Sequence, residues 1–202
     1  MVTIAELPAG FADKVLSAQS TFRAVMDAMA RPGSVHRLTV SVDAPPPMMR
    51  GTAALALTLF DHDTPVWCDS KMSAAPSVAK WLKFHSAAPI VADPSICSFA
   101  LVAEPSVLPD LSRFALGLDE YPDRSTTLVL QIPSLNEGPA YKLRGPGIDG
   151  VTEIEATLAP TDLVQRLAIN ASLFPRGIDV VLVADDAIAA IPRTTRLAAG
   201  GG

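Results

Sequence analysis

The residues best suited to chemistry lie in a few short segments, of which the densest is Asp61-His62-Asp63-Thr64-Pro65. Two carboxylates stand two positions apart there, directly after an apolar run. Such a pair could hold a divalent cation or supply an acid and a base. Asp61 and Asp63 are therefore candidate site residues.

The order Asp-x-Asp-Thr is also similar to the phosphotransfer signature of dehalogenase-like enzymes. That signature needs its first aspartate at the end of a parallel strand, whereas the residues before Asp61 favour a helix. The alternative is a loop that ends this helix, in which Asp63 hydrogen-bonds to backbone ahead of Pro65.

A second candidate segment is Ile191-Pro192-Arg193-Thr194-Thr195-Arg196. Pro192 should end a strand and turn the chain outward. The guanidinium of Arg193 offers a planar fork of donors, and the hydroxyls of Thr194 and Thr195 could add contacts to the same anion. The alternative is a solvated strand end with a polar rim.

His85 closes the run Trp81-Leu-Lys-Phe-His85, just past a predicted helix. It could serve in acid–base chemistry or contact a phosphate. Equally, the dipole at a helix C-terminus stabilises a histidine there without any further role. The three histidines show no metal-ligand spacing, so no metal site is expected.

Gly145-Pro146-Gly147-Ile-Asp-Gly150 spells the dinucleotide fingerprint G-x-G-x-x-G. That mechanism needs a helix after the glycines, because the helix N-terminus holds the pyrophosphate. Here the alternating residues 151–157 favour a strand, and Pro146 lacks a backbone donor. We therefore interpret the segment as a glycine-rich hairpin connection.

Composition narrows the class of protein. The 202 residues are 49% hydrophobic and 18% charged, which is typical of a globular chain. The net charge of −5 argues against a nucleic-acid binder. No apolar run is long enough for a membrane span, and Met1–Glu6 lacks the features of a secretory signal. We expect a cytoplasmic protein.

Cys68 and Cys97 are too far apart for a CxxC motif, and we expect them to be buried small hydrophobes. Two isolated cysteines cannot hold an iron–sulfur cluster within this chain.

The hydrophobic pattern predicts helices and strands that alternate first, with strands dominating later. This order indicates an α/β fold with a mixed sheet flanked by helices. We expect a single domain over residues 1–197 and a flexible tail over 198–202. Helices are predicted at 11–30, 48–60, 73–84, 105–116 and 161–173, and strands at 35–42, 66–68, 89–91, 96–102, 126–132, 141–144, 151–157, 178–184 and 187–191.

Some helix details can be predicted as well. Ser73 and Thr161 are plausible N-caps. The apolar residues of the first helix share one face, which should turn toward the core. They are Phe11, Val15, Phe22, Val25, Met26 and Met29.

Five matched segments, running from about residue 11 to 196, are similar to the PhnH family of bacterial carbon–phosphorus lyase subunits. Asp-x-Asp-Thr-Pro-Val-Trp and Ile-Pro-Arg-Thr-Thr are together highly specific, and the segments keep the family's order and spacing. The segments are Phe22-Arg23 with Met29–Gly33, Leu57–Trp67, Phe84-His85 with Ala88-Pro89, Phe174–Asp179 and Ala190–Thr195.

The resemblance implies a fold similar to the large domain of pyridoxal-phosphate-dependent transferases, without that cofactor. It also implies a homodimer that assembles with PhnG, PhnI and PhnJ. This machinery joins a phosphonate to the ribose of ATP and expels adenine, giving a ribose 1-phosphonate 5-triphosphate. The resemblance assigns no catalytic residue to this subunit and implies no cofactor bound by this chain, with ATP as a substrate of the complex.

Three functions therefore remain open. The chain could be a subunit of the synthase that prepares phosphonates for cleavage, or a dimeric scaffold that touches no substrate. It could also be a stand-alone phosphotransfer enzyme that uses Asp61 and Asp63 with a metal. An anion pocket holding both His85 and Arg193 would favour the first over the second.

Overall fold

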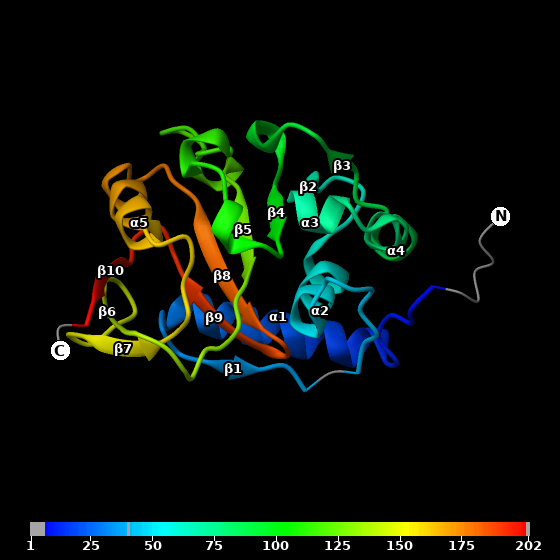
Figure 1. Cartoon of the computed structure of the whole chain (residues 1–202), viewed down its shortest axis with the longest axis horizontal. Coiled ribbons are helices and arrows are strands. Elements are labelled where there is room, and N and C mark those ends of the chain that lie inside the picture. Colours follow the sequence, from blue (N-terminus) through cyan, green and yellow to red (C-terminus); the bar gives the residue numbers. More distant parts are fainter. Residues whose placement is uncertain (1–6, 40, 201–202) are drawn as a thin grey trace.

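A seven-stranded sheet runs through the computed structural model, which describes residues 7–39 and 41–200 (Figure 1). The strands are β1 (His36–Arg37), β2 (Val66–Cys68), β3 (Ile90–Val91), β4 (Phe99–Val102), β5 (Thr127–Gln131), β8 (Asp179–Ala184) and β9 (Ala187–Ile191). Their order is β1-β9-β8-β5-β4-β2-β3, in which β3, β2, β4, β5 and β8 are parallel. β9 pairs antiparallel with both β8 and β1. The predicted α/β fold with a mixed sheet is confirmed.

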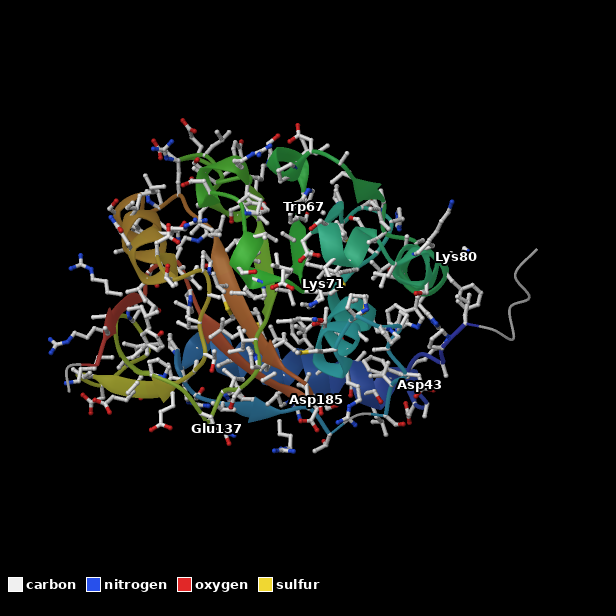
Figure 2. All side chains as sticks on the ribbon, viewed as in Figure 1. Asp43, Trp67, Lys71, Lys80, Glu137 and Asp185 are labelled. Atoms are coloured by element: carbon white, nitrogen blue, oxygen red, sulfur yellow. The ribbon has the colours of Figure 1, made fainter. Side chains whose placement is uncertain are left out.

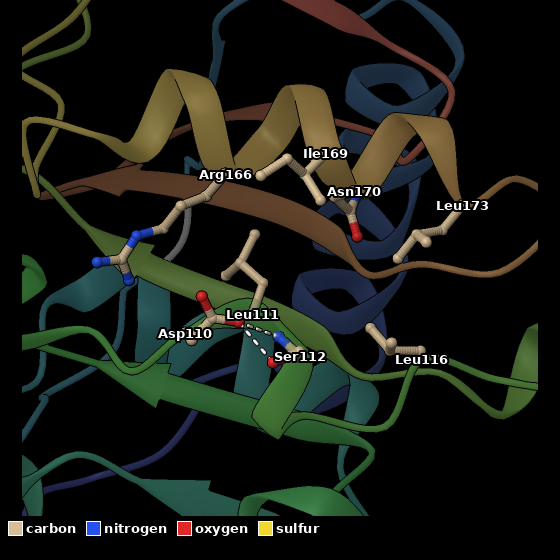
Figure 3. Close-up of a pocket in the computed structure, with 8 residues that line it drawn as sticks. All are labelled: Asp110, Leu111, Ser112, Leu116, Arg166, Ile169, Asn170 and Leu173. Atoms are coloured by element: carbon tan, nitrogen blue, oxygen red, sulfur yellow. Dashed lines mark hydrogen bonds between the residues drawn. The ribbon is translucent and has the colours of Figure 1, made fainter.

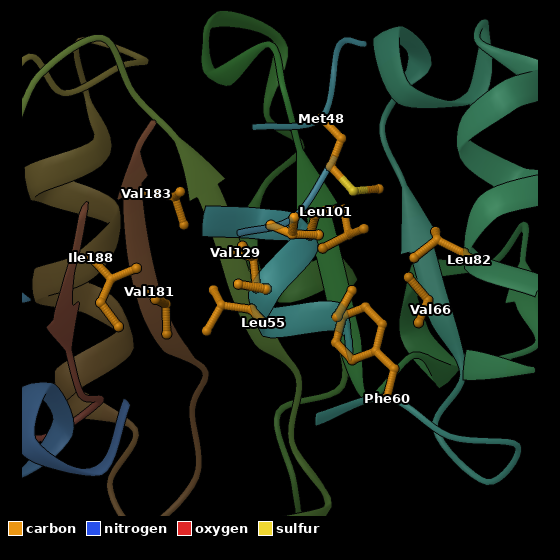
Figure 4. Close-up of a cluster of buried hydrophobic side chains, with 14 of the residues drawn as sticks. Met48, Leu55, Phe60, Val66, Leu82, Leu101, Val129, Val181, Val183 and Ile188 are labelled. Atoms are coloured by element: carbon orange, nitrogen blue, oxygen red, sulfur yellow. The ribbon is translucent and has the colours of Figure 1, made fainter. Parts of the chain in front are cut away.

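Both faces of this sheet are buried, which explains why the central strands β5 and β8 are apolar between their polar end residues Thr127, Gln131 and Asp179. In β5, Leu128 and Leu130 point into one core and Val129 into the other. β8 alternates in the same way, with Val181 on the side of Val129. Figure 4 shows these two valines beside Leu55.

Helices cover the first face. They are α1 (Lys14–Ala30), α2 (Arg50–Leu59), the single turn α3 (Ser70–Ser73) and α4 (Pro76–Ser86). Every residue from 51 to 56 of α2 is buried, as expected for a helix that is apolar on nearly all sides. α1 crosses β9 and packs on α2 (Figure 1).

The second face is covered by α5 (Leu163–Ser172) and by a three-stranded antiparallel sheet of order β10-β6-β7. Its strands are β6 (Ala140–Arg144), β7 (Thr152–Glu155) and β10 (Arg196–Ala199). Residues 145–151 connect β6 to β7, so the predicted glycine-rich hairpin is confirmed. Gly147 has a φ of 82°, and a Cβ there would lie 2.1 Å from the carbonyl oxygen of Ala30.

The predicted core face of the first helix is half right. Phe11 and Val25 are buried and Met29 packs against the core, whereas Val15, Phe22 and Met26 are 65, 51 and 53% exposed. Thr21 and Ala28 are buried as well, and these smaller side chains let α1 approach its neighbours closely. Val15, Phe22 and Met26 form a separate, outward face.

Both predicted helix caps are also wrong. The Ser73 hydroxyl donates to the carbonyl of Cys68 at 3.1 Å, and α4 begins at Pro76 without a side-chain cap. At α5 the cap position is Asp162 instead of Thr161, and its carboxylate binds Arg166 at 2.9 Å.

The helix predicted at 105–116 is replaced by two 3-10 turns, Pro105–Val107 and Leu111–Arg113. Pro109 lacks a backbone donor and disfavours helical geometry at Leu108. The strand predicted at 35–42 is shorter than expected, since residues 36–37 form β1 and pair with β9.

The strand predicted at 96–102 is likewise shorter, since residues 94–96 form a 3-10 turn and β4 begins at Phe99. Three residues of the predicted flexible tail are ordered: Ala198 and Ala199 belong to β10, and Gly200 donates to the carbonyl of Ala140 at 2.8 Å. Residues 1–6, which carried the expectation about a signal, and 201–202 of the tail lie outside the described residues.

Among the described residues, no helix has the length and apolar character needed to cross a membrane.

Candidate functional site

Arg193 is held inside the protein instead of facing an external anion. The β8–β9 register places Asp179 beside it, and both side chains are mostly buried, at 14 and 15% exposed. Its backbone N–H and Nε donate to Asp179 Oδ1 at 2.8 and 3.2 Å, and a terminal nitrogen contacts Asp179 Oδ2. The guanidinium also donates to the carbonyl of Pro122 at 2.7 Å and to Ser125 Oγ at 2.6 Å.

The donors of Arg193 are thus committed to this chain's own acceptors. The sequence suggested either that Arg193 binds an external anion or that it lies at a solvent-exposed strand end. Its position in the structure matches neither expectation. Thr194 and Thr195 form the turn that follows, in which the Thr195 N–H donates to the carbonyl of Pro192 at 2.8 Å. The Thr195 hydroxyl is buried and makes no hydrogen bond to the described residues.

Asp61 and Asp63 lie in an exposed turn after α2. The Asp63 N–H donates to Asp61 Oδ1 at 2.9 Å, and the Thr64 hydroxyl bonds to both the N–H and the carbonyl of Asp61. The expected helix-ending loop is therefore present, although Asp61 and Thr64 bond the backbone there instead of Asp63. Within residues 7–39 and 41–200, no group of three or more His, Cys, Asp or Glu side chains could hold a metal ion.

His85 lies in the last turn of α4 and fixes the segment before α1. Its Nε2 is 3.1 Å from the carbonyl oxygen of Pro8, which also accepts from Trp81 Nε1 at 3.0 Å. Because a carbonyl only accepts, Nε2 must carry a proton. The helix itself ends with a backbone bond from the Ala87 N–H to the carbonyl of Lys83, and His85 lies in the last turn, where a helix dipole favours a basic side chain.

A cavity of about 200 Å³ lies beside His85, lined also by Gly10, Phe11, Lys14, Leu57 and Phe84. Arg193 borders a different pocket, with Pro122, Asp123 and Pro175. His85 and Arg193 therefore do not share an anion site. The fold places the six candidate residues in three separate parts of the structure.

Asp69 is a buried residue that the sequence reasoning missed. From β2 the chain crosses to β3 on one side and then returns to β4 on the other, and open α/β sheets bind ligands at such a switch point. Asp69 lies there and accepts backbone N–H bonds from Met72, Ala103 and Glu104, all at 2.8 Å. An aspartate directly after a buried strand was the available signal.

The switch point is thus closed by the chain's own groups. Lys71 bonds to Glu104 across it at 3.0 Å. At the end of the neighbouring β5, Gln131 Oε1 accepts from the N–H of Met49 and from the Thr52 hydroxyl, which satisfies the start of α2. These polar groups position secondary structure.

A small cavity of about 60 Å³ lies between α5 and residues 110–116, as Figure 3 shows. Its polar groups are also committed, since Asp110 accepts from the N–H and hydroxyl of Ser112 and Asn170 bonds both backbone groups of Ile178. Sites for organic ligands are commonly several times larger.

Comparison with known proteins gives a consistent result. The family described as bacterial phosphonate metabolism protein (PhnH) matches residues 9–198. A protein of Rhizobium meliloti (strain 1021), named alpha-D-ribose 1-methylphosphonate 5-triphosphate synthase subunit PhnH, is 43% identical over 93% of this chain and 93% of its own. A putative C-P lyase subunit protein, HtxG, of Stutzerimonas stutzeri is 28% identical over 89% of this chain and 85% of its own.

Proposed function

Because this chain belongs to the PhnH family of bacterial phosphonate metabolism proteins, we propose that it is a subunit of the synthase that joins a phosphonate to ATP in phosphonate catabolism. The products would be a ribose 1-phosphonate 5-triphosphate and adenine. The observation that carries this proposal is 43% identity, over nearly the full length of both chains, to a relative named as a subunit of that synthase.

Within that assembly the chain acts as an accessory subunit. His85, Arg193 and the Asp61–Asp63 turn lie apart, and each bonds chiefly within this chain. This separation favours an accessory subunit over a subunit with its own catalytic centre. The stand-alone phosphotransfer enzyme is disfavoured, because α2 and not a parallel strand precedes Asp61.

The fold is proposed to be that of the large domain of pyridoxal-phosphate-dependent transferases, without the cofactor. Such a cofactor needs a lysine that reaches a pocket. The five lysines of this chain are all exposed, and Lys71, the one nearest the switch point in sequence, is paired with Glu104 (Figure 2). This placement supports a chain that binds no cofactor of its own.

The proposed partners are a second copy of this chain and the subunits PhnG, PhnI and PhnJ, with no nucleic acid and no membrane involved. We place the assembly in the cytoplasm, where ATP is present. Cys68 and Cys97 are buried free thiols, as is usual in a reducing compartment.

The outward face of α1, defined by Val15, Phe22 and Met26, supports the homodimer. If two copies of α1 pack antiparallel about a two-fold axis near residue 20, Val15 of one copy meets Met26 of the other. Lys14 then lies beside the partner's Asp27, which also accepts from Arg31 of its own chain at 3.3 Å, and the antiparallel helix dipoles attract one another. Large apolar side chains and complementary charges thus coincide on one surface.

The test combines purified subunits with growth. The chain alone should release no adenine from ATP and methylphosphonate, and adding it to its partner subunits should restore release. A strain lacking the gene should fail to grow on methylphosphonate as sole phosphorus source and should recover with this chain. Rapid adenine release by the isolated chain would contradict the accessory role, and normal growth of the deletion strain would contradict the proposal as a whole.

A further inference from the structure

Two arginine side chains face one another on the exposed side of the small sheet. The β10–β6 register places Arg196 directly opposite Arg144. Their neighbours Leu143 and Leu197 are buried, so alternation along the strands turns both arginines to solvent. Side chains opposite one another in an antiparallel pair have Cβ atoms roughly 4.5–5.5 Å apart. Among the described residues, no carboxylate forms an ion pair with either guanidinium.

Lys142 extends this positive cluster. It lies on the same face of β6, two positions before Arg144, and is diagonal to Arg196 across the strands. The carboxylates on this face belong to β7, where Glu153 lies 3.9 Å from the Lys142 ammonium and Glu155 is opposite Ala140. The negative charges therefore lie toward one end of the sheet and the two arginines toward the other. Figure 2 shows nitrogen-tipped side chains extending into solvent beside β6 and β10.

Like charges directly opposite one another destabilise a sheet. The chain carries 21 acidic residues, yet none of those described pairs with Arg144 or Arg196. An external anion removes the repulsion. Guanidinium forks bind phosphate oxygens bidentately, and two adjacent forks with an ammonium suit a ligand with several phosphate charges better than a single carboxylate.

We propose that Arg144 and Arg196, assisted by Lys142, form a binding site for a diphosphate or triphosphate group. Arg196 is the last residue of the segment in which Arg193 was expected to bind an anion. Arg193 is committed to Asp179, so the arginine free to bind is three residues further along. All three residues of the proposed site belong to this chain, so the site does not depend on the proposed assembly.

The test is calorimetric titration of the purified chain with inorganic tripolyphosphate at low ionic strength. We expect binding by the wild-type chain and at least about tenfold weaker binding by Arg144→Ala and by Arg196→Ala, since each removes charge-assisted hydrogen bonds. Arg113→Ala is the matched control, because Arg113 is an exposed arginine in a 3-10 turn outside the small sheet. It should bind like the wild type. Orthophosphate should bind at least about tenfold more weakly than tripolyphosphate.

Thermal unfolding gives a second readout that separates the site from a structural role. Tripolyphosphate should raise the unfolding temperature of the wild-type chain and not that of the double variant Arg144→Ala/Arg196→Ala. Charged residues on an edge strand also discourage pairing with another chain. If this were the only role of the two arginines, the chain would not bind tripolyphosphate. The proposal is overturned if the wild-type chain does not bind, if Arg113→Ala weakens binding equally, or if orthophosphate binds as tightly as tripolyphosphate.

Discussion

At the scale of single residues, Arg193 shows how an arginine suited to binding can instead hold a fold together. Its guanidinium joins the start of β8, through Asp179, to the carbonyl of Pro122 and the hydroxyl of Ser125. Three segments far apart in the sequence meet at this one side chain. Truncating it leaves the carboxylate of Asp179 buried without its counter-charge.

We predict that Arg193→Ala lowers the free energy of unfolding by about 3–5 kcal/mol, the usual cost of removing one partner from a buried ion pair. Urea denaturation monitored by circular dichroism measures this change. The matched control is Arg196→Ala, three residues further on and exposed, which should stay within about 0.5 kcal/mol of the wild type. An Arg193→Ala chain as stable as the control would show that the ion pair contributes little.

Cys68 supports a prediction about reactivity. Burial, followed by the nearby carboxylate of Asp69, raises the pKa of the Cys68 thiol to about 12. Because the thiolate is the reactive form, almost none is present at pH 8. The native chain should therefore react slowly at Cys68 with a thiol reagent, and the chain unfolded in guanidinium should react fully. Mass spectrometry of the labelled peptide reports both, and rapid labelling of native Cys68 would contradict the prediction.

At the scale of elements, α1 shows which structural features the spacing of apolar residues predicts and which it does not. The spacing of its apolar residues correctly predicted a helix, but both faces of α1 carry apolar side chains. The inner face consists largely of small residues, such as Ala28 and Ala24, that permit close packing. Periodicity grouped large side chains from both faces, so of the six predicted residues Phe11, Val25 and Met29 meet the core and the other three face outward. Which face meets the core depends on the neighbouring elements, and no local pattern contains that information.

We predict that Phe22→Glu dissociates the proposed homodimer. The substitution places a carboxylate in the centre of the outward face of α1, and truncation at interface centres commonly costs 2 kcal/mol or more, which is at least about 30-fold in the dissociation constant. Sedimentation velocity at micromolar concentration measures the change. Ile169→Glu is the matched control, because Ile169 is a comparably exposed apolar residue on α5. A Phe22→Glu chain that remains dimeric would exclude this face of α1 as the interface.

At the scale of the whole molecule, the sequence predicted the sheet better than the site. Short apolar runs such as 180–184 favoured buried strands, and the alternation of such strands with helices predicted the mixed sheet. Candidate site residues were chosen by chemical type, yet most polar groups at the sheet edges bond backbone. Asp69 and Gln131 satisfy N–H groups brought together from distant segments. Such partners are defined by topology, and spacing along the chain does not reveal them.

The same view of the whole chain leads to a prediction about the Asp61–Asp63 turn. If the chain contributes surfaces to an assembly and carries no phosphotransfer centre, its exposed carboxylates there are dispensable for chemistry. Asp63 is 82% exposed and its nearest charged partner is His62, 77% exposed, so Asp63→Asn should leave folding and growth on methylphosphonate unchanged. Asp61→Asn retains an oxygen that can accept the Asp63 N–H, so the turn should also survive this change. Growth rates of strains carrying each variant, compared at equal protein levels, decide the matter. If the Asp61→Asn protein folds normally but its strain cannot grow on methylphosphonate, Asp61 has a role in the chemistry. That result would contradict the accessory role.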